Sequence, residues 1–414
     1  MSKLRVEHFG PITTGCAEDN GFMDFRKVTV LIGNQGTGKS SIAKLFSTCC
    51  WLEKALFQGR LTPKYVMGYN RFVKQYCAYQ NLKNYFRPGT VVEYQGSAYH
   101  LTYRNEKLLV APVAAASGYR VPQIMYVPAE RNFLSAVDEP DKLKGLPQSL
   151  LTFWEELRRA QREAPDNLAL AVGQVRFAYD KRRNIPRISG TTAGKVAFDL
   201  RLSEASSGFQ SLVPLLLVLR HLTARHEHDD SRSALSAEER RKLTVRVNEI
   251  LNNQQLTPEV RGVALAALSQ RFRTETLLSI VEEPEQNLFP TSQRAMLYQL
   301  LEYANTNVGN ELVLTTHSPY IVNYLTLAIK AQEVLQKATT QAAPTEALQQ
   351  LHSIVPATAA VAAADTVVYE LTEAGQIQRL ATYHGLPSDD NYLNQQLEEA
   401  NNLFADLLGL EATF

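Results

Sequence analysis

The segment from Phe25 to Ser41 combines an apolar run with glycines, a lysine and hydroxyl side chains at the spacing of a phosphate-binding loop. The β-branched run 28–32 predicts a buried strand and Lys39 opens the following helix, so the pattern G-x-x-x-x-G-K-[ST] has its required strand–loop–helix setting. Glycines let consecutive backbone N–H groups turn inward around phosphate oxygens. We expect Lys39 to reach the β- and γ-phosphates and Ser40 to ligate Mg²⁺. The predicted nucleotide-binding residues of this loop are Asn34, Gln35, Gly36, Thr37, Gly38, Lys39, Ser40 and Ser41.

Two strand ends further along the chain carry groups that suit hydrolysis of a bound nucleotide. The apolar run 277–281 predicts a buried strand that delivers Glu282 and Glu283 at its carboxyl end. One carboxylate can hold Mg²⁺, which we assign to Glu282, and the next can polarise the attacking water, which we assign to Glu283. A second short strand, 312–315, is followed by His317, a further candidate for the catalytic site.

Two further stretches are candidates for phosphate or metal contacts. Ser206, Ser207 and Gly208 precede a strongly apolar helix, and a hydroxyl with bare N–H groups at a helix start suits a γ-phosphate. Glu130 and Arg131 follow the apolar strand 124–127, and either could contact the metal or the γ-phosphate. We include Glu130 with Ser40 and Glu282 among the predicted metal ligands.

The order of these motifs resembles that of ABC-type ATPase heads of the SMC and RecF kind, closest to the OLD-family ATPase and the AAA15/AAA21 group. Residues 205–208, Ala-Ser-Ser-Gly, resemble the Leu-Ser-Gly-Gly signature, and residues 282–290, Glu-Glu-Pro-Glu-Gln-Asn-Leu-Phe-Pro, are typical of that group. His317 looks like the switch histidine of that family, placed to contact the γ-phosphate and line up the water. Four departures stand out: Glu282 replaces the usual Asp, Ser207 replaces the first signature Gly, Ala205 replaces the signature Leu, and the expected Q-loop glutamine is absent near Glu130.

The resemblance implies a fold and a mechanism. The expected fold class is α/β, a P-loop ABC-type ATPase head with an antiparallel β lobe and a helical insertion. It implies ATP and Mg²⁺ as cofactors and a head-to-tail homodimer, or a multiple of it, because the signature of one subunit contacts the γ-phosphate bound to the other. Hydrolysis by Glu283 would then open the closed pair.

Composition limits the class of protein. The chain has 414 residues, 45% of them hydrophobic, and a formal net charge of +1, so it can bury a large core and is not broadly polycationic. Its four cysteines lack a zinc-type spacing and predict reduced thiols. No membrane span or signal-peptide apolar region is evident, so we expect a cytoplasmic protein without a membrane partner.

The chain divides into an expected ATPase domain, 1–335, and an acidic C-terminal subdomain, 336–414, packed on it. Within the first, 54–120 forms a basic and aromatic β lobe and 223–274 a helical insertion. Residues 54–92 contain no acidic residue, and their basic and aromatic side chains could contact DNA or form the core of the lobe itself. The segment 346–411 carries ten acidic residues and only one basic residue, Arg379.

The process that the ATPase drives is a separate hypothesis. We favour DNA-directed defence or repair that controls a nuclease or toxin, because this chain resembles related proteins of that kind in architecture. Some of those proteins carry a Toprim nuclease in the same chain, whereas the tail after His317 lacks the acidic strand-end cluster and the length of such a domain, so we expect the effector to be a separate polypeptide. A transporter ATPase subunit is the alternative from another class. In such subunits the signature is followed almost directly by the Walker B strand, whereas here a helical insertion lies between the two. An ATP-binding scaffold with little hydrolysis is a third reading, which the signature departures permit.

Overall fold

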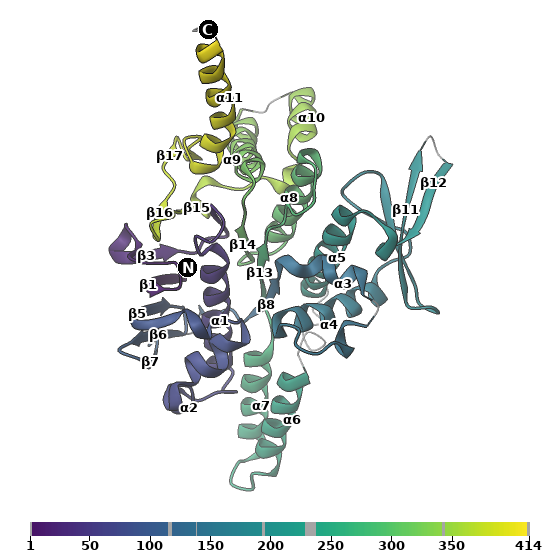
Figure 1. Cartoon of the computed structure of the whole chain (residues 1–414). Helices are drawn as coiled ribbons and strands as arrows, with labels where there is room; N and C mark the ends of the chain where they lie inside the picture. Colours follow the sequence, from purple (N-terminus) through teal and green to yellow (C-terminus); the bar gives the residue numbers. More distant parts are fainter. Residues whose placement is uncertain are drawn as a thin grey trace.

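A seven-stranded sheet forms the centre of the molecule in the computed structural model, which describes residues 2–114, 118–137, 139–192, 195–227, 237–341 and 344–411 (Figure 1). Its strand order is β2-β16-β15-β4-β14-β13-β8. The five strands from β15 to β8 are parallel, and β16 runs antiparallel to β15. Their bounds are β2 (Gly15–Cys16), β16 (Gln376–Arg379), β15 (Thr366–Leu371), β4 (Val28–Gly33), β14 (Glu311–Thr315), β13 (Thr276–Glu282) and β8 (Pro122–Val127).

The alternating side chains of the central strands face two separate apolar cores. In β4, Val30 and Ile32 belong to one core, whereas Leu31 belongs to the other. The first core is covered by helices α4, α5, α8 and α9, and the second by α1. Burial on both faces accounts for the nearly continuous apolar strand sequences. These helices are α1 (Lys39–Phe57), α4 (Gln148–Glu163), α5 (Ser207–Glu227), α8 (Pro290–Asn305) and α9 (Pro319–Thr340), with the short α3 (Phe133–Ala136) beside α5.

Two antiparallel sheets flank this centre. The five-stranded sheet β3-β1-β5-β6-β7 shares the second core with α1. Its strands are β3 (Phe22–Asp24), β1 (Lys3–Phe9), β5 (Phe86–Gln95), β6 (Tyr99–Arg104) and β7 (Lys107–Pro112), and α2 (Pro63–Met67) contacts β7. A four-stranded sheet, β12-β11-β10-β9, lies between α4 and α5 in the chain. Its strands are β9 (Leu168–Ala169), β10 (Val175–Asp180), β11 (Ile185–Thr192) and β12 (Lys195–Arg201).

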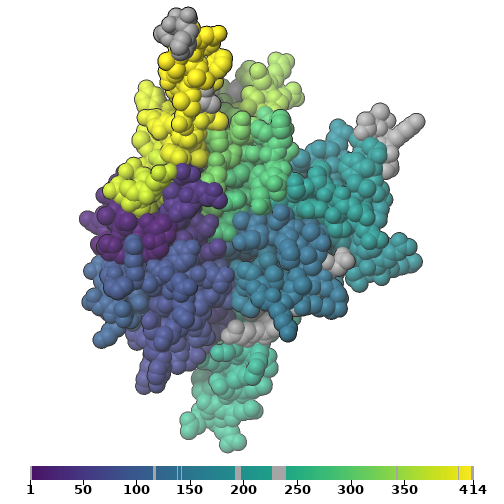
Figure 2. Space-filling view, viewed as in Figure 1, coloured from purple at the N-terminus to yellow at the C-terminus, as the bar shows by residue number. Residues whose placement is uncertain are grey.

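A helical pair projects from the molecule beyond α1. Helices α6 (Ala237–Asn252) and α7 (Pro258–Phe272) pack against each other and form the teal projection in Figures 1 and 2. Glu239 of α6 lies 3.0 Å from Lys54 and 3.5 Å from Arg60, which attaches the pair to the end of α1. The predicted α/β fold class, with an antiparallel lobe and a helical insertion, is confirmed. Residues 228–236 of the expected insertion lie outside the described part of the chain.

The C-terminal part of the chain contributes to the central sheet. After α10 (Thr345–Ile354), β15 lies directly beside β4, and β16 follows. A small ribbon, β17 (Thr382–Tyr383) and β18 (Leu386–Pro387), leads to α11 (Tyr392–Glu411), which extends away from the body at the end opposite α6 and α7 (Figure 1). The expected boundary at residue 336 between an ATPase domain and a C-terminal subdomain stays a prediction. Two strands of the expected subdomain, β15 and β16, belong to the central sheet of the expected ATPase domain.

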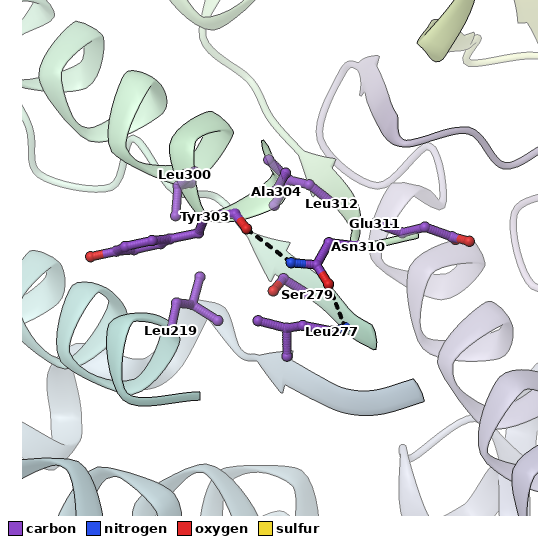
Figure 3. Close-up of a pocket in the computed structure, with 9 residues that line it drawn as sticks. All are labelled: Leu219, Leu277, Ser279, Leu300, Tyr303, Ala304, Asn310, Glu311 and Leu312. Carbon is purple, nitrogen blue, oxygen red and sulfur yellow. Dashed lines mark hydrogen bonds between the residues drawn. The ribbon is translucent and has the colours of Figure 1, made fainter. Parts of the chain in front are cut away.

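Tight packing extends to the seam between α5, α8 and the edge of β13. Figure 3 shows this seam, where the Asn310 amide accepts a hydrogen bond from Leu277 N at 2.8 Å and donates one to Tyr303 O at 3.1 Å. It has no room for a water molecule, and none of the predicted site residues lines it. Among the described residues, no helix is both long and apolar enough to cross a membrane.

Candidate functional site

The predicted phosphate-binding loop connects β4 to α1 at the carboxyl edge of the parallel sheet. Gly38 caps α1 with a φ of 102°, and a Cβ there would come within 2.9 Å of side-chain atoms of Pro11 and Ile12. Gly36 has a φ of 81° and nothing within 4 Å of an added Cβ, so the loop is open on that side. The sequence therefore forms the strand–loop–helix setting that a phosphate cradle requires.

Lys39 lies at the centre of this loop. Its ammonium donates to Gly33 O at 2.9 Å and Asn34 O at 2.8 Å, and it lies 3.4 Å from Nδ1 of His317. Burial lowers the pKa of Lys39 to about 8, although Glu283 and Glu285 act in the opposite direction. The lysine is thus held close to the predicted hydrolytic residues.

Glu283 and His317 face each other across two neighbouring strand ends. The Glu283 backbone has a φ of 43°, rare for a residue with a side chain, and its N–H donates to Thr315 O at 2.9 Å. This turn places Oε1 of Glu283 3.5 Å from Nε2 of His317. The hydrogen bond from His317, with further help from Lys39 and Arg131, lowers the pKa of Glu283 despite partial burial, so its carboxylate is ionised at neutral pH.

Glu285 supports the histidine segment. Its Oε1 accepts hydrogen bonds from Thr316 Oγ1 and His317 N, both at 2.8 Å. Burial raises the pKa of this carboxyl group, and the bonds from His317 and Thr316 oppose the shift. No sequence pattern indicates this role, because the position of Glu285 after Pro284 gives no signal of a contact with the next strand end.

Glu282 offers an oxygen that fits a metal ion. The side chain is buried; Oε2 accepts a hydrogen bond from Ala129 N at 3.2 Å, while Oε1 has no hydrogen-bond partner among the described residues. Oε1 lies 3.4 Å from Lys44 Nζ, so this ammonium would compete with a metal ion for the oxygen. Among the described residues no group of three or more His, Cys, Asp or Glu could hold a metal. One carboxylate and the Ser40 hydroxyl suit Mg²⁺, which keeps waters and takes phosphate oxygens as its other ligands.

Glu130 and Arg131 differ sharply in their surroundings. Glu130 is exposed, and its side chain forms no hydrogen bond or ion pair with the described residues, so its role as a metal ligand stays a prediction. Arg131 is 0% exposed, and its guanidinium donates to four backbone carbonyls. A γ-phosphate contact by Arg131, the alternative expected from the sequence, stays a prediction that this arrangement does not support, because the buried guanidinium already donates four hydrogen bonds inside the protein.

The signature-like residues lie at the exposed start of α5. Ser206 and Ser207 are exposed, and the Ser206 carbonyl accepts the first helical hydrogen bond from Gln210 N at 3.0 Å. Gly208 packs so closely against the loop after β13 that a Cβ would come within 2.8 Å of Asn287 O. In the described structure no hydrogen bond joins 206–208 to 33–41. One chain thus brings Lys39, Glu282, Glu283 and His317 together but leaves Ser206 and Ser207 exposed on another element.

The C-terminal hairpin also contacts the loop, which was not expected. Asn34 Nδ2 donates to Glu373 Oε1 at 2.6 Å, and Gly33 approaches Leu371 so closely that a Cβ would come within 2.3 Å of its carbonyl oxygen. The Asn34 side chain is thereby bound to the protein, and its own Oδ1 accepts from Gln35 N at 2.7 Å. A contact of Asn34 with nucleotide stays a prediction, and with its side chain bound in this way it would involve the backbone.

Comparison with known proteins adds remote structural likenesses only. No family model and no curated protein matches the chain. It is similar to an SMC head bound to the C-winged helix domain of ScpA (12% identity, 92% of this chain and 96% of that one, TM-score 0.39). It is also similar to the SMC head domain from Thermotoga maritima (13% identity, 78% and 90%, TM-score 0.35). A third is a dimeric ATP-binding cassette in a post-hydrolysis state bound to ADP and Pi (9% identity, 92% and 100%, TM-score 0.30). Likenesses this remote assign no function.

Proposed function

We propose that this protein binds and hydrolyses ATP with Mg²⁺, as a switch that closes and opens a head-to-tail homodimer. The observation that carries the proposal is the division of the site. Lys39, Glu283 and His317 lie together, whereas Ser206 and Ser207 are exposed on another element of the same chain. A second copy can supply the missing helix start to each nucleotide.

Each residue has a definite task in this proposal. The loop N–H groups and Lys39 bind the phosphates, and Ser40 and Glu282 hold Mg²⁺. Glu283, ionised at neutral pH, orients and polarises a water, with His317 beside it. The water oxygen bonds to the γ-phosphorus, the bond to the ADP oxygen breaks, and the released proton passes to Glu283 and then to solvent. The SMC and cassette likenesses agree with this proposal but do not carry it.

A trap experiment tests this proposal. Glu283→Gln removes the charge that polarises the water but keeps the side-chain size, so ATP should bind and persist. We expect this variant to be a monomer without nucleotide and a dimer with ATP and Mg²⁺ in light scattering, while Lys39→Ala stays monomeric in both. Glu283→Gln protein that binds ATP and remains monomeric would overturn the head-to-tail dimer.

We further propose that the switch acts in DNA-directed defence or repair and controls a separate nuclease or toxin. The support is a surface formed by α2 and the residues after it, where Arg71 lies 3.9 Å from the Tyr65 ring centroid and 5.0 Å from that of Tyr69. Tyr69 is 86% exposed, and no acidic residue occurs in 54–92. Exposed aromatic rings with adjacent cations suit unpaired bases and phosphates. Other members of the stretch, including Phe72 and Tyr76, belong instead to the apolar core.

Two measurements separate this role from its alternatives. Single-stranded DNA should stimulate ATP hydrolysis, and the double variant Tyr69→Ala, Arg71→Ala should lose stimulation while its ATPase without DNA is unchanged. A co-purified nuclease or toxin would support the effector. Absence of DNA stimulation together with recovery in membrane fractions beside a permease would favour a transporter subunit, and ATP binding without turnover would favour a scaffold.

A further inference from the structure

The buried guanidinium of Arg131 joins three separate segments of the chain. It donates to Pro128 O at 3.2 Å in its own loop and to Ser211 O at 3.2 Å in α5. It also donates to Glu282 O and Glu283 O, both at 2.7 Å, at the end of β13. All four acceptors are backbone carbonyls, so one side chain ties the first turns of α5 directly to the two carboxylate-bearing residues.

The chemistry of arginine makes this junction specific. Its planar fork of N–H donors can bind several carbonyls at once in fixed directions, which the single ammonium of a lysine cannot do. Burying the charge of Arg131 is costly. In the described structure no carboxylate forms an ion pair with Arg131, and burial lowers its pKa to about 10. Such an arrangement persists only where the surrounding backbone is firmly placed.

Close packing also connects the start of α5 to the segment after β13. Gly208 of α5 has no space for a Cβ against Asn287 O, and Ser211 Oγ lies 3.4 Å from Gln286 Oε1. The start of α5 and the segment from Glu282 to Asn287 therefore cannot shift independently by much. In the proposed dimer these two elements serve different nucleotides, because Glu283 acts on the chain's own ATP and Ser206–Gly208 on that of the second copy.

We propose that Arg131 is a positioning residue that couples the two nucleotide sites of the dimer. Nucleotide bound at Lys39 and Glu283 shifts the end of β13, and Arg131 transmits the shift to the helix start that contacts the other ATP. This inference rests on the proposed function. It adds a physical route by which occupation of one site changes hydrolysis at the other.

The direct test isolates one chain from its second copy. Ser207→Arg places a long cation at the predicted contact between copies and should give a monomer that still binds ATP. In this background, hydrogen exchange of amides 207–213 should change about fivefold or more on addition of a slowly hydrolysed ATP analogue with Mg²⁺. Adding Arg131→Lys should abolish that change while nucleotide affinity remains.

A matched control uses an arginine that also bridges two backbone carbonyls. Arg26 donates to Ala364 O at 3.1 Å and Thr366 O at 3.2 Å, away from β13 and α5. Arg26→Lys in the monomeric background should leave the exchange response intact. If Arg131→Lys does not fold, as judged by thermal unfolding, Arg131→Gln replaces it, because the amide keeps a donor without burying a charge.

A second measurement uses the full protein. The Hill coefficient of ATP hydrolysis should exceed one in the wild type and fall to about one in Arg131→Lys, with turnover per site reduced less than the cooperativity. An unchanged exchange response and Hill coefficient in the folded variant would overturn the coupling role. A wild-type chain that does not bind ATP, or a Ser207→Arg variant that still dimerises with ATP, would instead contradict the proposed function.

Discussion

The Lys39 ammonium lies 3.4 Å from Nδ1 of His317, while Nε2 of the same ring lies 3.5 Å from the Glu283 carboxylate. The three side chains come from the start of α1, the end of β14 and the end of β13. A neutral imidazole with its proton on Nε2 satisfies both contacts, since it accepts from the lysine and donates to the carboxylate. The groups proposed to bind phosphate and to polarise water are thus connected within one chain.

The pKa of Lys39 predicts how ATP affinity depends on pH. Burial lowers this pKa to about 8 in the free protein, and the negative charge of bound triphosphate must raise it. Below pH 8 the lysine is charged with or without nucleotide, so affinity should be constant there. Above pH 8 only the bound form keeps the proton, so affinity should fall, approaching about tenfold per pH unit. Titration of a fluorescent ATP analogue between pH 7 and 9.5 measures this dependence.

Lys39→Arg is the matched variant for the pH experiment. The guanidinium stays protonated throughout this range, so its affinity, even if weaker overall, should be independent of pH. A wild-type affinity that is equally flat up to pH 9.5 would show that the lysine keeps its charge and that burial does not control its protonation.

Removing the Glu285 carboxylate should slow hydrolysis without weakening ATP binding. Glu285 holds Thr316 Oγ1 and His317 N at 2.8 Å, and a displacement of His317 by about 1 Å can reduce catalysis up to about 100-fold. We expect Glu285→Ala to show such a loss in turnover with an unchanged dissociation constant for ATP. Glu285→Gln keeps an acceptor oxygen and should retain most activity. Equal turnover in both variants would remove Glu285 from the positioning of the histidine.

The residues that the sequence predicted correctly are those fixed by local pattern. Glycine spacing after an apolar strand predicts the loop around Lys39, and carboxylates that end a buried strand predict Glu282 and Glu283 at the sheet edge. The contact between Asn34 and Glu373 was not predictable, because it depends on β15 pairing with β4 across more than 330 residues. Likewise, nothing in the residues around Arg131 indicates that its charge is buried among carbonyls of β13 and α5.

Gly208→Ala should disturb the start of α5 more than Ser207→Ala does. An added Cβ would come within 2.8 Å of Asn287 O, a backbone atom that cannot rotate away, so α5 or the loop after β13 must shift. Overpacking of this kind destabilises by about 1–3 kcal/mol. We expect a lower midpoint of thermal unfolding and impaired ATP-dependent dimerisation. Ser207→Ala removes only an exposed hydroxyl and should keep the stability of the wild type; equal unfolding midpoints for the two variants would contradict the tight packing.

Substitution of Glu282 and substitution of its neighbour Lys44 should change the Mg²⁺ concentration that hydrolysis requires in opposite directions. Lys44 Nζ lies 3.4 Å from Oε1, the oxygen that has no hydrogen-bond partner, and so competes with a metal ion for it. Glu282→Gln should raise the Mg²⁺ concentration for half-maximal ATP hydrolysis about tenfold or more. Lys44→Met should lower it by up to about fivefold, as expected for a partly exposed ion pair.

Magnesium titrations at saturating ATP measure both effects. Lys330→Met provides the control, because Lys330 pairs with Glu333 on the outer face of α9 at 2.7 Å and should not influence the metal. Opposite shifts in the two site variants, with none in the control, are expected if Glu282 faces the ion. If Glu282→Gln and Lys44→Met both need the same Mg²⁺ as the wild type, the metal is held elsewhere, and the exposed carboxylate of Glu130 becomes the next ligand to substitute.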